Sequence, residues 1–521
     1  MLQLIVFFSG AVLMSLEMVG SRLLAPAFGT SIYVWGSLIV VVMAALTLGY
    51  YCGGRIADKY PKFEMMGAIL GIAGVFIGFL PFWTQPVNRL CSALEPRTGS
   101  LLASLAFFFL PSVMLAAISP FGIKLTSRSL TTIGNSAGHM SAISTAGSII
   151  GTLATSFFLI PELGVRNIVH SLGVILLLLS LLACFTAWRS HNKKLVQPIM
   201  LIVFLVCGLL LVLWRIIPGG NRLHEWGEVL YDRDSLYHHI IVDQIGPERH
   251  LHFDNSYQSA INLEQPLAMV FSYTSYLHLG VVARPQPSRA LFIGLGGGSA
   301  PRKFLHDYPS LETVEAVEID PEIAKVAYRY FQLPENDPRL RVIVKDGRLY
   351  VEQKAWEIAA GKAKSYDIVV IDAYSASSIP YHLTTLEFVQ NVRQILSPDG
   401  VVVSNIIGAI SGPYSQLLLA MKRTFDQAFN QTYLFPVGGV SGPQDTLERN
   451  MILVATMDKE RWDVVTWRKK AEDLHNSGAI AEFVPIYATV LVDETQMGDW
   501  MAKIPILTDD YAPVDTLKNP L

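Results

Sequence analysis

The chain has 521 residues, of which 51% are hydrophobic and 16% are charged, and its mean hydropathy is +0.39. Soluble globular chains carry about 25% charged residues, so this composition argues against a wholly soluble protein. The net charge of −3 offers no electrostatic basis for binding nucleic acid. The four cysteines form no CxxC or CxxH cluster, so neither a disulfide framework nor a metal site is indicated.

Long apolar stretches fill the first part of the chain, and they predict a transmembrane helical domain over residues 1–218. Each stretch is close to the ~20 residues that span the hydrocarbon core of a bilayer. The fifth is rich in small residues, which is typical of closely packed helices. The sequence therefore predicts seven spans, with approximate bounds 2–20, 32–51, 65–84, 101–119, 137–160, 166–188 and 198–217.

An acidic residue, Glu17, lies inside the first predicted span. Its presence and the lack of a basic leader favour a retained helix over a cleaved signal peptide. A carboxylate within a span is costly and tends to face a partner or a watery cavity. One interpretation is a structural ion pair with Arg22, and the other is a ligand contact or a proton relay.

After the spans, the pattern changes to that of a soluble α/β protein. Residues 226–264 alternate apolar and polar positions between turns, which predicts a small β-hairpin subdomain over residues 219–285. Residues 286–521 then alternate strands with helices, so we expect a Rossmann-like, doubly wound sheet that closes with an antiparallel pair. The predicted strands are 289–293, 313–319, 340–344, 367–371, 400–405, 432–436 and 450–455.

Three features of this half point to an adenosine ligand. A glycine-rich turn, 294–298, directly follows a strand and opens a helix, where the backbone can approach a ligand closely. Glu318 ends the next strand, where a carboxylate can bind both ribose hydroxyls. Asp346 and Gly347 follow the third strand, where an aspartate can accept from the adenine amino group. The spacing favours S-adenosylmethionine over NAD, and the alternative is that both carboxylates only cap helices.

The soluble half resembles the spermidine synthase family of aminopropyltransferases. The first helix also matches the membrane-fused, spermidine synthase-like proteins, which carry Phe-x-Ser-Gly-Ala followed by Glu-x-x-x-x-Arg. The corresponding residues here are Phe7-Phe8-Ser9-Gly10-Ala11, Glu17 and Arg22. The resemblance covers nearly all of the chain. Its soluble motifs are Ser235-Leu236-Tyr237-His238-His239, Gly294-Leu295-Gly296-Gly297-Gly298, Val317-Glu318-Ile319-Asp320, Val344-Lys345-Asp346-Gly347, residues 366–372 and residues 396–401.

The chain departs from that family at positions that bind cationic groups. The family's Gly-Gly-Gly-Asp loop has Ser299 in place of the aspartate that holds the donor's amino group. Its Asp-Ser-Ser-Asp-Pro stretch becomes 372–376, which keeps Asp372 but has Ser375 at the second acidic position. The family's Tyr-His-Glu stretch is absent near residues 271–276. These departures put a polyamine acceptor in doubt.

The resemblance and the position after the fourth strand assign Asp372 as the catalytic base. A sulfonium donor carries its own leaving group, so one carboxylate that deprotonates and aligns an incoming amine suffices. Tyr374 and His382 lie on the following loop, and we predict that both are catalytic, although a histidine in such a place more often packs or caps. Asp509, near the C-terminus, either supplies a missing acidic group or lies in an exposed turn.

The predicted donor site comprises the Asp372 carboxylate and residues from three earlier segments. We expect Ser299 to contact the donor, where its hydroxyl favours intact S-adenosylmethionine over the decarboxylated form; the alternative is that it caps the helix. The remaining predicted donor-binding residues are Gln258, Gly294, Gly296, Gly298, Glu318, Asp346 and Gly347.

The loop charges and the expected donor disagree about which side of the membrane holds the soluble half. Loops after even-numbered spans carry eight Lys and Arg residues and the other loops carry six, which with seven spans places the soluble half outside. The donors are made in the cytosol, and we therefore expect an inner-membrane protein whose catalytic domain is cytoplasmic.

The sequence thus predicts a membrane-anchored aminopropyl- or aminocarboxypropyltransferase. It would use decarboxylated or intact S-adenosylmethionine, act on an amine or another small nucleophile, release methylthioadenosine and need no metal. We also expect contact with the lipid bilayer and a homodimer, and no nucleic-acid partner. The alternatives are an S-adenosylmethionine-dependent methyltransferase and a transporter with an S-adenosylmethionine-sensing domain.

Overall fold

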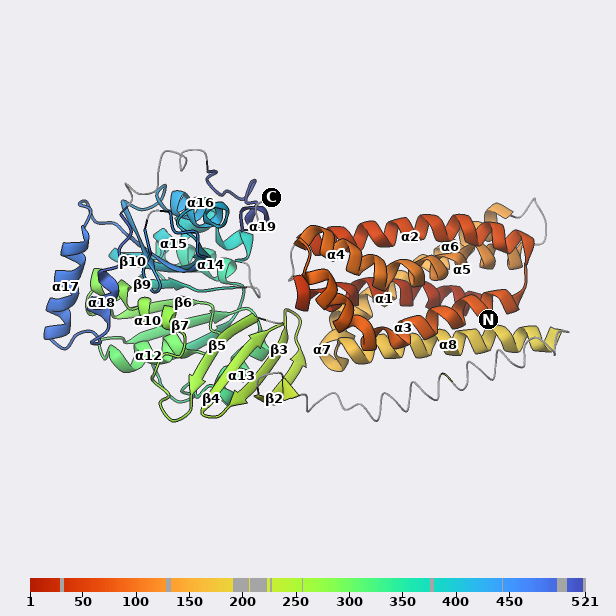
Figure 1. The fold of residues 1–521 in the computed structure, drawn as a ribbon, viewed down its shortest axis with the longest axis horizontal. Coiled ribbons are helices and arrows are strands. Elements are labelled where there is room, and N and C mark those ends of the chain that lie inside the picture. The colour runs from red at the N-terminus through yellow and green to blue at the C-terminus, as the bar shows by residue number, and fades with distance from the viewer. Residues whose placement is uncertain are drawn as a thin grey trace. The chain divides into compact units, whose positions relative to one another are not determined.

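A computed structural model describes residues 1–28, 32–127, 133–190, 206, 223–224, 227–254, 256–374, 379–442, 444–493 and 504–518. The chain separates into two compact units (Figure 1). One comprises Met1–Arg222 with Asp232–His239, and the other Leu223–Tyr231 with Ile240–Leu521.

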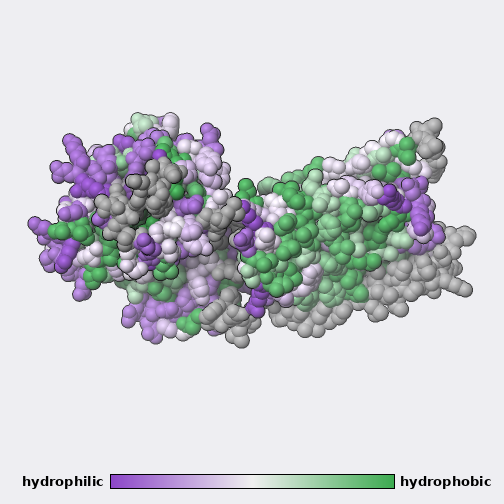
Figure 2. All heavy atoms as spheres, turned by 45° about the horizontal axis from the view of Figure 1, so that its top comes forward, coloured by the Kyte–Doolittle hydropathy of each residue, from purple (hydrophilic) through white to green (hydrophobic). Residues whose placement is uncertain are grey.

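The first unit is helical, and six of its helical stretches are long and apolar enough to cross a membrane. Hydrophobic side chains cover much of its visible surface (Figure 2). The seventh predicted span, 198–217, lies outside the described residues except for Val206. The elements are α1 (Leu2–Phe28), α2 (Ile32–Lys59), α3 (Phe63–Ser92), α4 (Pro96–Ser104), η1 (Leu105–Phe109), α5 (Leu110–Thr126), α6 (Ile133–Ala154), η3 (Thr155–Leu159), α7 (Ile160–Leu163) and α8 (Val165–Ser190).

Small residues bring α1 and α6 into backbone contact. A Cβ atom on Gly147 would lie 2.0 Å from the Phe7 carbonyl oxygen. This distance is too short for any residue larger than glycine. The Thr155 hydroxyl donates to Ser15 Oγ at 2.8 Å across the same interface. The small residues of the predicted fifth span therefore serve helix packing. Glu17 and Arg22 do not form an ion pair in the described part of the chain.

The second unit begins with a five-stranded sheet in the order β1-β2-β3-β4-β5. One face of this sheet buries Val242, Leu251 and Ile261 against Ile323 and Phe331, at either end of helix α13. The strands are β1 (Leu223–His224), β2 (Gly227–Asp234), β3 (His239–Ile245), β4 (Glu248–Phe253) and β5 (Ser256–Asn262).

A seven-stranded sheet in the order β11-β12-β10-β9-β6-β7-β8 forms the centre of the unit. The five strands from β10 to β8 are parallel, whereas β12 pairs antiparallel with both β10 and β11. Its strands are β6 (Arg289–Ile293), β7 (Thr313–Glu318), β8 (Leu340–Val344), β9 (Tyr366–Ile371), β10 (Leu396–Gly408), β11 (Gln431–Pro436) and β12 (Arg449–Thr456). The predicted Rossmann-like sheet and its antiparallel end are thus present.

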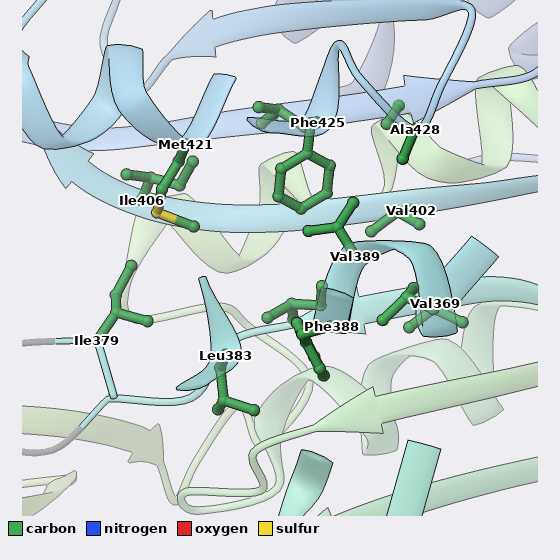
Figure 3. Packing of buried hydrophobic residues seen from close by; sticks show 14 of the residues in the cluster. Val369, Ile379, Leu383, Phe388, Val389, Val402, Ile406, Met421, Phe425 and Ala428 are labelled. Atoms are coloured by element: carbon green, nitrogen blue, oxygen red, sulfur yellow. The ribbon is translucent and has the colours of Figure 1, made fainter. Parts of the chain in front are cut away.

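Helices cover both faces of this sheet, so its central strands are apolar on both sides. Along β6, Leu291 faces one hydrophobic cluster and Phe292 the other. On the first face, Phe388 and Phe425 pack over the sheet beside Val402 (Figure 3). The helices are α10 (Ser272–Tyr276), α11 (Leu279–Ala283), α12 (Ser299–Asp307), α13 (Pro321–Tyr330), α14 (Gly347–Ala359), η4 (Tyr381–Leu383), α15 (Leu386–Gln394), η5 (Pro413–Ser415), α16 (Gln416–Phe425), α17 (Val464–Asn476), α18 (Val484–Ala488) and α19 (Val514–Lys518).

Candidate active site

The carboxyl ends of four neighbouring parallel strands bring the predicted site residues to one edge of the large sheet. In the order β9-β6-β7-β8, these strands end at Asp372, the glycine loop 294–298, Glu318 and Asp346. Ligands of open α/β sheets bind at this edge. The topology therefore brings together groups that are up to 78 positions apart in the sequence (294 to 372).

The glycine loop and Asp372 are in direct contact. Gly294 has a φ of +99°, and a Cβ atom there would lie 2.1 Å from the Asp372 carbonyl oxygen. The Asp372 N–H donates to the Ile293 carbonyl at 2.9 Å, which joins the two strand ends. Only glycine allows this approach, so Gly294 lets the predicted base lie beside the glycine loop.

Ser299 is the first residue of α12, after Gly298, which occupies the cap position with a φ of +73°. The Ser299 hydroxyl does not cap the helix. It donates to the Ala260 carbonyl at 3.2 Å and lies 3.4 Å from the Ser259 hydroxyl. Strand β5 of the smaller sheet, which also carries half-buried Gln258, therefore contacts the start of α12.

Glu318 is buried at the end of β7 and faces the glycine loop. Its carboxylate accepts from the Leu295 N–H at 3.2 Å and from the Asp320 N–H at 3.0 Å. Burial raises the pKa of Glu318 to about 7, although these backbone donors oppose the rise. The predicted contact of Glu318 with the donor ribose stays a prediction.

Asp346 caps α14 and faces a second predicted site residue. Its Oδ1 atom accepts from the Leu349 N–H at 3.0 Å, and its Oδ2 atom lies 3.2 Å from His382 Nε2. A Cβ atom on Gly347 would lie 2.7 Å from the Ile293 side chain, so this glycine allows α14 to start close to β6. His382 thus lies beside the predicted adenine-binding carboxylate.

The carboxylate of Asp372 accepts two hydrogen bonds from uncharged side chains. Tyr273 of α10 donates its hydroxyl to Oδ2 at 3.1 Å, and Asn405 of β10 donates its amide to Oδ1 at 2.9 Å. Burial raises the pKa of Asp372, whereas the two donors act in the opposite direction. Tyr273 has a pKa well above 10 because of burial and the Asp372 charge, so it stays a donor.

Tyr374 bonds to the backbone of β10. Its hydroxyl donates to the Asn405 carbonyl at 3.2 Å and accepts from the Ile407 N–H at 2.8 Å. The segment 375–378 that follows lies outside the described residues. The predicted catalytic role of Tyr374 therefore stays a prediction, and its observed contacts hold β10 against the base.

Asp509 lies in the turn that the bridge between Thr508 and Tyr511 closes. Its two carboxylate oxygens accept from the two Nη atoms of Arg348, each at 2.6 Å. This ion pair lowers the pKa of Asp509, mainly through the hydrogen bond from Arg348. Asp509 thus has an internal cationic partner, which favours the turn interpretation over a substrate contact.

Residues 270–434 match the family described as the spermine/spermidine synthase domain. The polyamine aminopropyltransferase of Vibrio vulnificus is 29% identical over 331 residues, which cover 62% of this chain and 99% of that protein. The C-terminal half therefore contains a spermine/spermidine synthase domain. This synthase domain includes the glycine loop, Glu318, Asp346 and Asp372.

The other matches include a methyltransferase and a solved structure of a probable spermidine synthase. The human eEF1A lysine and N-terminal methyltransferase is 34% identical over 146 residues, which cover 27% of this chain and 20% of that protein. A crystal structure of a probable spermidine synthase from Corynebacterium glutamicum is 19% identical, with a TM-score of 0.43, and covers 54% of this chain and 97% of that one.

Several polar residues of the synthase-domain site were missed from the sequence. Tyr273 lies in the stretch that departs from the family's Tyr-His-Glu pattern, and its own hydroxyl was not considered. Asn405 interrupts the apolar run of β10, and this signal was available. Ser259 and Asn450 have no comparable local signal. In the described ranges, no group of three or more His, Cys, Asp or Glu residues could hold a metal ion.

Proposed function

We propose that this protein is a membrane-anchored transferase that moves an aminopropyl-type group from a sulfonium donor to an amine or a related nucleophile. The observation that supports it best is the Asp372 carboxylate, which lies against the glycine loop with a neutral donor on each oxygen. A carboxylate in that place can accept a proton from a nucleophile while the loop holds the donor.

In the proposed reaction, the nucleophile attacks the carbon next to the sulfonium sulfur. A new bond to that carbon forms as the carbon–sulfur bond breaks, and the electron pair of that bond neutralises the sulfonium. Asp372 takes the proton that the attacking amine loses. The products are the alkylated amine and methylthioadenosine, so the step needs neither an oxidant nor an external leaving-group activator.

The donor contacts are assigned by the edge they share with Asp372. Glu318 would accept from the ribose hydroxyls and Asp346 from the adenine amino group, while Gly294, Gly296 and Gly298 let the backbone approach the nucleoside. Gln258 and Ser299 would contact the donor's amino-acid end. The Ser299 hydroxyl is presented beside β5 and carries no charge, in contrast to the aspartate of soluble spermidine synthases.

Product analysis tests this function. The purified full-length protein is incubated with decarboxylated or intact S-adenosylmethionine and a panel of amines, and the nucleoside product is identified by mass spectrometry. Methylthioadenosine that forms only when an amine is present is the expected result. If neither donor gave a nucleoside product, the proposed enzymatic function would be refuted. That result would favour a transporter with an S-adenosylmethionine-sensing domain.

A methyltransferase is the second candidate. Two observations favour it: Ser299 removes the charge that would repel the carboxylate of intact S-adenosylmethionine, and a relative at 34% identity is named a methyltransferase. The same experiment separates the two candidates, since methyl transfer releases S-adenosylhomocysteine. S-adenosylhomocysteine as the sole product would replace the first proposal with this one.

We further propose that the helical unit spans the inner membrane, that the synthase domain faces the cytosol and that the protein is a homodimer. Six long apolar helices support the first statement, and the cytosolic origin of both donors supports the second. An alkaline phosphatase fused to the C-terminus should then be inactive, because that enzyme needs the periplasm. Strong phosphatase activity would place the synthase domain on the periplasmic side of the membrane.

The proposed homodimer is tested separately, by the molar mass that light scattering gives for the protein in detergent.

A further inference from the structure

A second asparagine lies behind the Asn405–Asp372 contact. Asn450, at the start of β12, donates its Nδ2 group to Asn405 Oδ1 at 3.0 Å. In the antiparallel β10–β12 pair, Asn450 is opposite Ile407 and Asn405 is opposite Ile452. The two asparagines are thus diagonal neighbours on one face of the sheet, close enough for their side chains to meet.

This contact and the contact with the Asp372 carboxylate together fix which way the Asn405 amide points. A primary amide accepts through its oxygen and donates through its nitrogen. Because Asn450 donates to Oδ1, the Asn405 nitrogen is the group that meets Asp372 Oδ1, at 2.9 Å. Rotating the amide by half a turn would oppose the Asn405 oxygen to the carboxylate and its nitrogen to the Asn450 nitrogen, so both contacts would become repulsive.

The surroundings of Asp372 limit what else can control its proton affinity. Among the residues that the structure describes, the titratable side chains that face it are Tyr273, from α10, and Tyr374, on its own segment. Both phenols have pKa values well above 10 because they are buried next to a negative charge, so both stay neutral. Tyr374 also bonds the backbone of Asn405 and thereby fixes the position from which the Asn405 side chain extends.

We propose that Asn450 is a positioning residue for the base. It orients the Asn405 amide, and through that amide it holds the Asp372 carboxylate in one rotamer with its proton-accepting oxygens available to the nucleophile. Asn450 does not touch substrate in this arrangement. The inference rests on the proposed function, because it assigns Asn450 a role in positioning the carboxylate that takes the proton of the nucleophile.

The decisive variant is Asn450→Asp, which replaces the donor with an acceptor of the same size. The Asn405 amide would then turn its nitrogen toward residue 450 and its oxygen toward Asp372. A carboxylate that loses a donor and gains a facing oxygen holds its proton more tightly. The acid limb of the turnover–pH profile should therefore move upward by about one pH unit. Turnover should fall about tenfold at a pH well below the midpoint of that limb, and KM should change less than twofold.

A double variant shows whether the effect passes through Asn405. In an Asn405→Ala background, the further change Asn450→Asp should alter the pH profile by less than 0.3 pH unit, roughly the limit of non-additivity expected between independent sites. Asn450→Ala, which only removes the donor, should shift the limb in the same direction by less, and it serves if the aspartate variant does not fold. Asn430→Asp is the matched control. Asn430 lies just before β11 and donates to the Met457 carbonyl, so it is outside this network.

A readout independent of turnover separates this inference from the proposed function. The Asp372 carboxyl is titrated by infrared difference spectroscopy on the full-length protein, with Asp372→Asn subtracted to assign the band. Asn450→Asp should raise the titration midpoint whether or not the protein transfers an aminopropyl group. An unchanged midpoint, or a shift that persists fully in the Asn405→Ala background, would overturn the positioning role.

Discussion

The two halves of the candidate site hold their carboxylates in different ways. At the donor edge, which comprises residues 294–299, Glu318 and Asp346, backbone N–H groups donate to both carboxylates, and the His382 side chain also lies beside Asp346. At the reacting edge, which comprises Asp372, Tyr273 and Asn405, side chains from α10 and β10 do so. Backbone donors come with the strand–loop–helix geometry itself, whereas side-chain donors must be supplied by particular residues from distant segments.

This difference has a chemical meaning. A carboxylate bound by the adjoining backbone keeps its place whatever the neighbouring side chains are, which suits a group that only binds. A carboxylate held by neutral side chains keeps acceptor capacity and has its proton affinity set by each neighbour. Single substitutions at the reacting edge should therefore mainly lower turnover. Single substitutions at the donor edge should mainly lower the affinity for the donor.

The largest effect is expected from Asp372→Asn. The amide cannot take the proton of the nucleophile, so turnover should fall by about 10²–10⁴-fold, the range typical of general base catalysis. Titration with methylthioadenosine should show affinity within a few-fold of the wild type. A variant that retains most of its turnover would mean that the two edges do not differ as described.

Glu318→Ala should have the opposite signature. Removing a buried carboxylate that accepts from ribose hydroxyls loses about 1.5–3 kcal/mol of binding, or about tenfold to hundredfold in methylthioadenosine affinity. Turnover at saturating donor should change far less than in Asp372→Asn. Wild-type affinity in a correctly folded variant would remove Glu318 from the donor site.

The pH dependence of donor binding sharpens the same contrast. Burial holds the pKa of Glu318 near 7 in the unliganded domain, above its ordinary value of 4.5, and ribose hydroxyls favour the ionised form. The affinity for methylthioadenosine should thus be constant above pH 7. Well below pH 7, it should fall by about tenfold for each pH unit. Calorimetric titration from pH 5.5 to 8.5 measures this, and Glu318→Gln should bind more weakly but without the pH dependence.

Charge at position 299 tests donor choice within the donor edge. Ser299→Asp should weaken intact S-adenosylmethionine by about tenfold or more, because two carboxylates would meet, and should spare the decarboxylated donor. Ser299→Asn is the matched control, since it has the size of aspartate without its charge. Equal losses for both donors, or a wild-type preference for the decarboxylated form, would refute this role of Ser299.

The smallest effect is expected from Asp509→Ala. Its partner Arg348 binds it in a partly exposed ion pair, and such pairs contribute about 1 kcal/mol or less to stability. The melting temperature should fall slightly, and the KM for the amine should stay within twofold of the wild type. A tenfold rise in KM would instead make Asp509 part of the acceptor site.

The same contrast explains how much of the molecule could be predicted from the sequence. Each of the seven strands of the large sheet was located because its apolar run is short and is bounded by turns or helices. The glycine loop, Glu318, Asp346 and Asp372 were placed at one edge because each directly follows its strand. Six of the seven predicted spans coincide with long apolar helices, and the seventh lies outside the described residues except for Val206.

The contacts of the reacting edge were beyond sequence reasoning. That Asn405 meets Asp372 depends on the register of parallel strands β9 and β10, and that Asn450 meets Asn405 depends on the register of an antiparallel strand far along the chain. Hydrophobic periodicity locates strands but leaves such registers open by one or more residues. A catalytic role for His382 is predicted from its place on the loop after β9, and η4 brings its ring to Asp346.

Strand β12 joins the sheet through an antiparallel pairing late in the chain, and this affects how the protein is made. Because synthesis proceeds from the N-terminus, the donor edge is complete while Asn450 has yet to be added. Domains fold as their residues emerge from the ribosome. A nascent or prematurely terminated chain that ends before β12 would thus have its nucleoside-binding residues without an oriented base, so that catalytic competence is acquired only at the last stage of biogenesis.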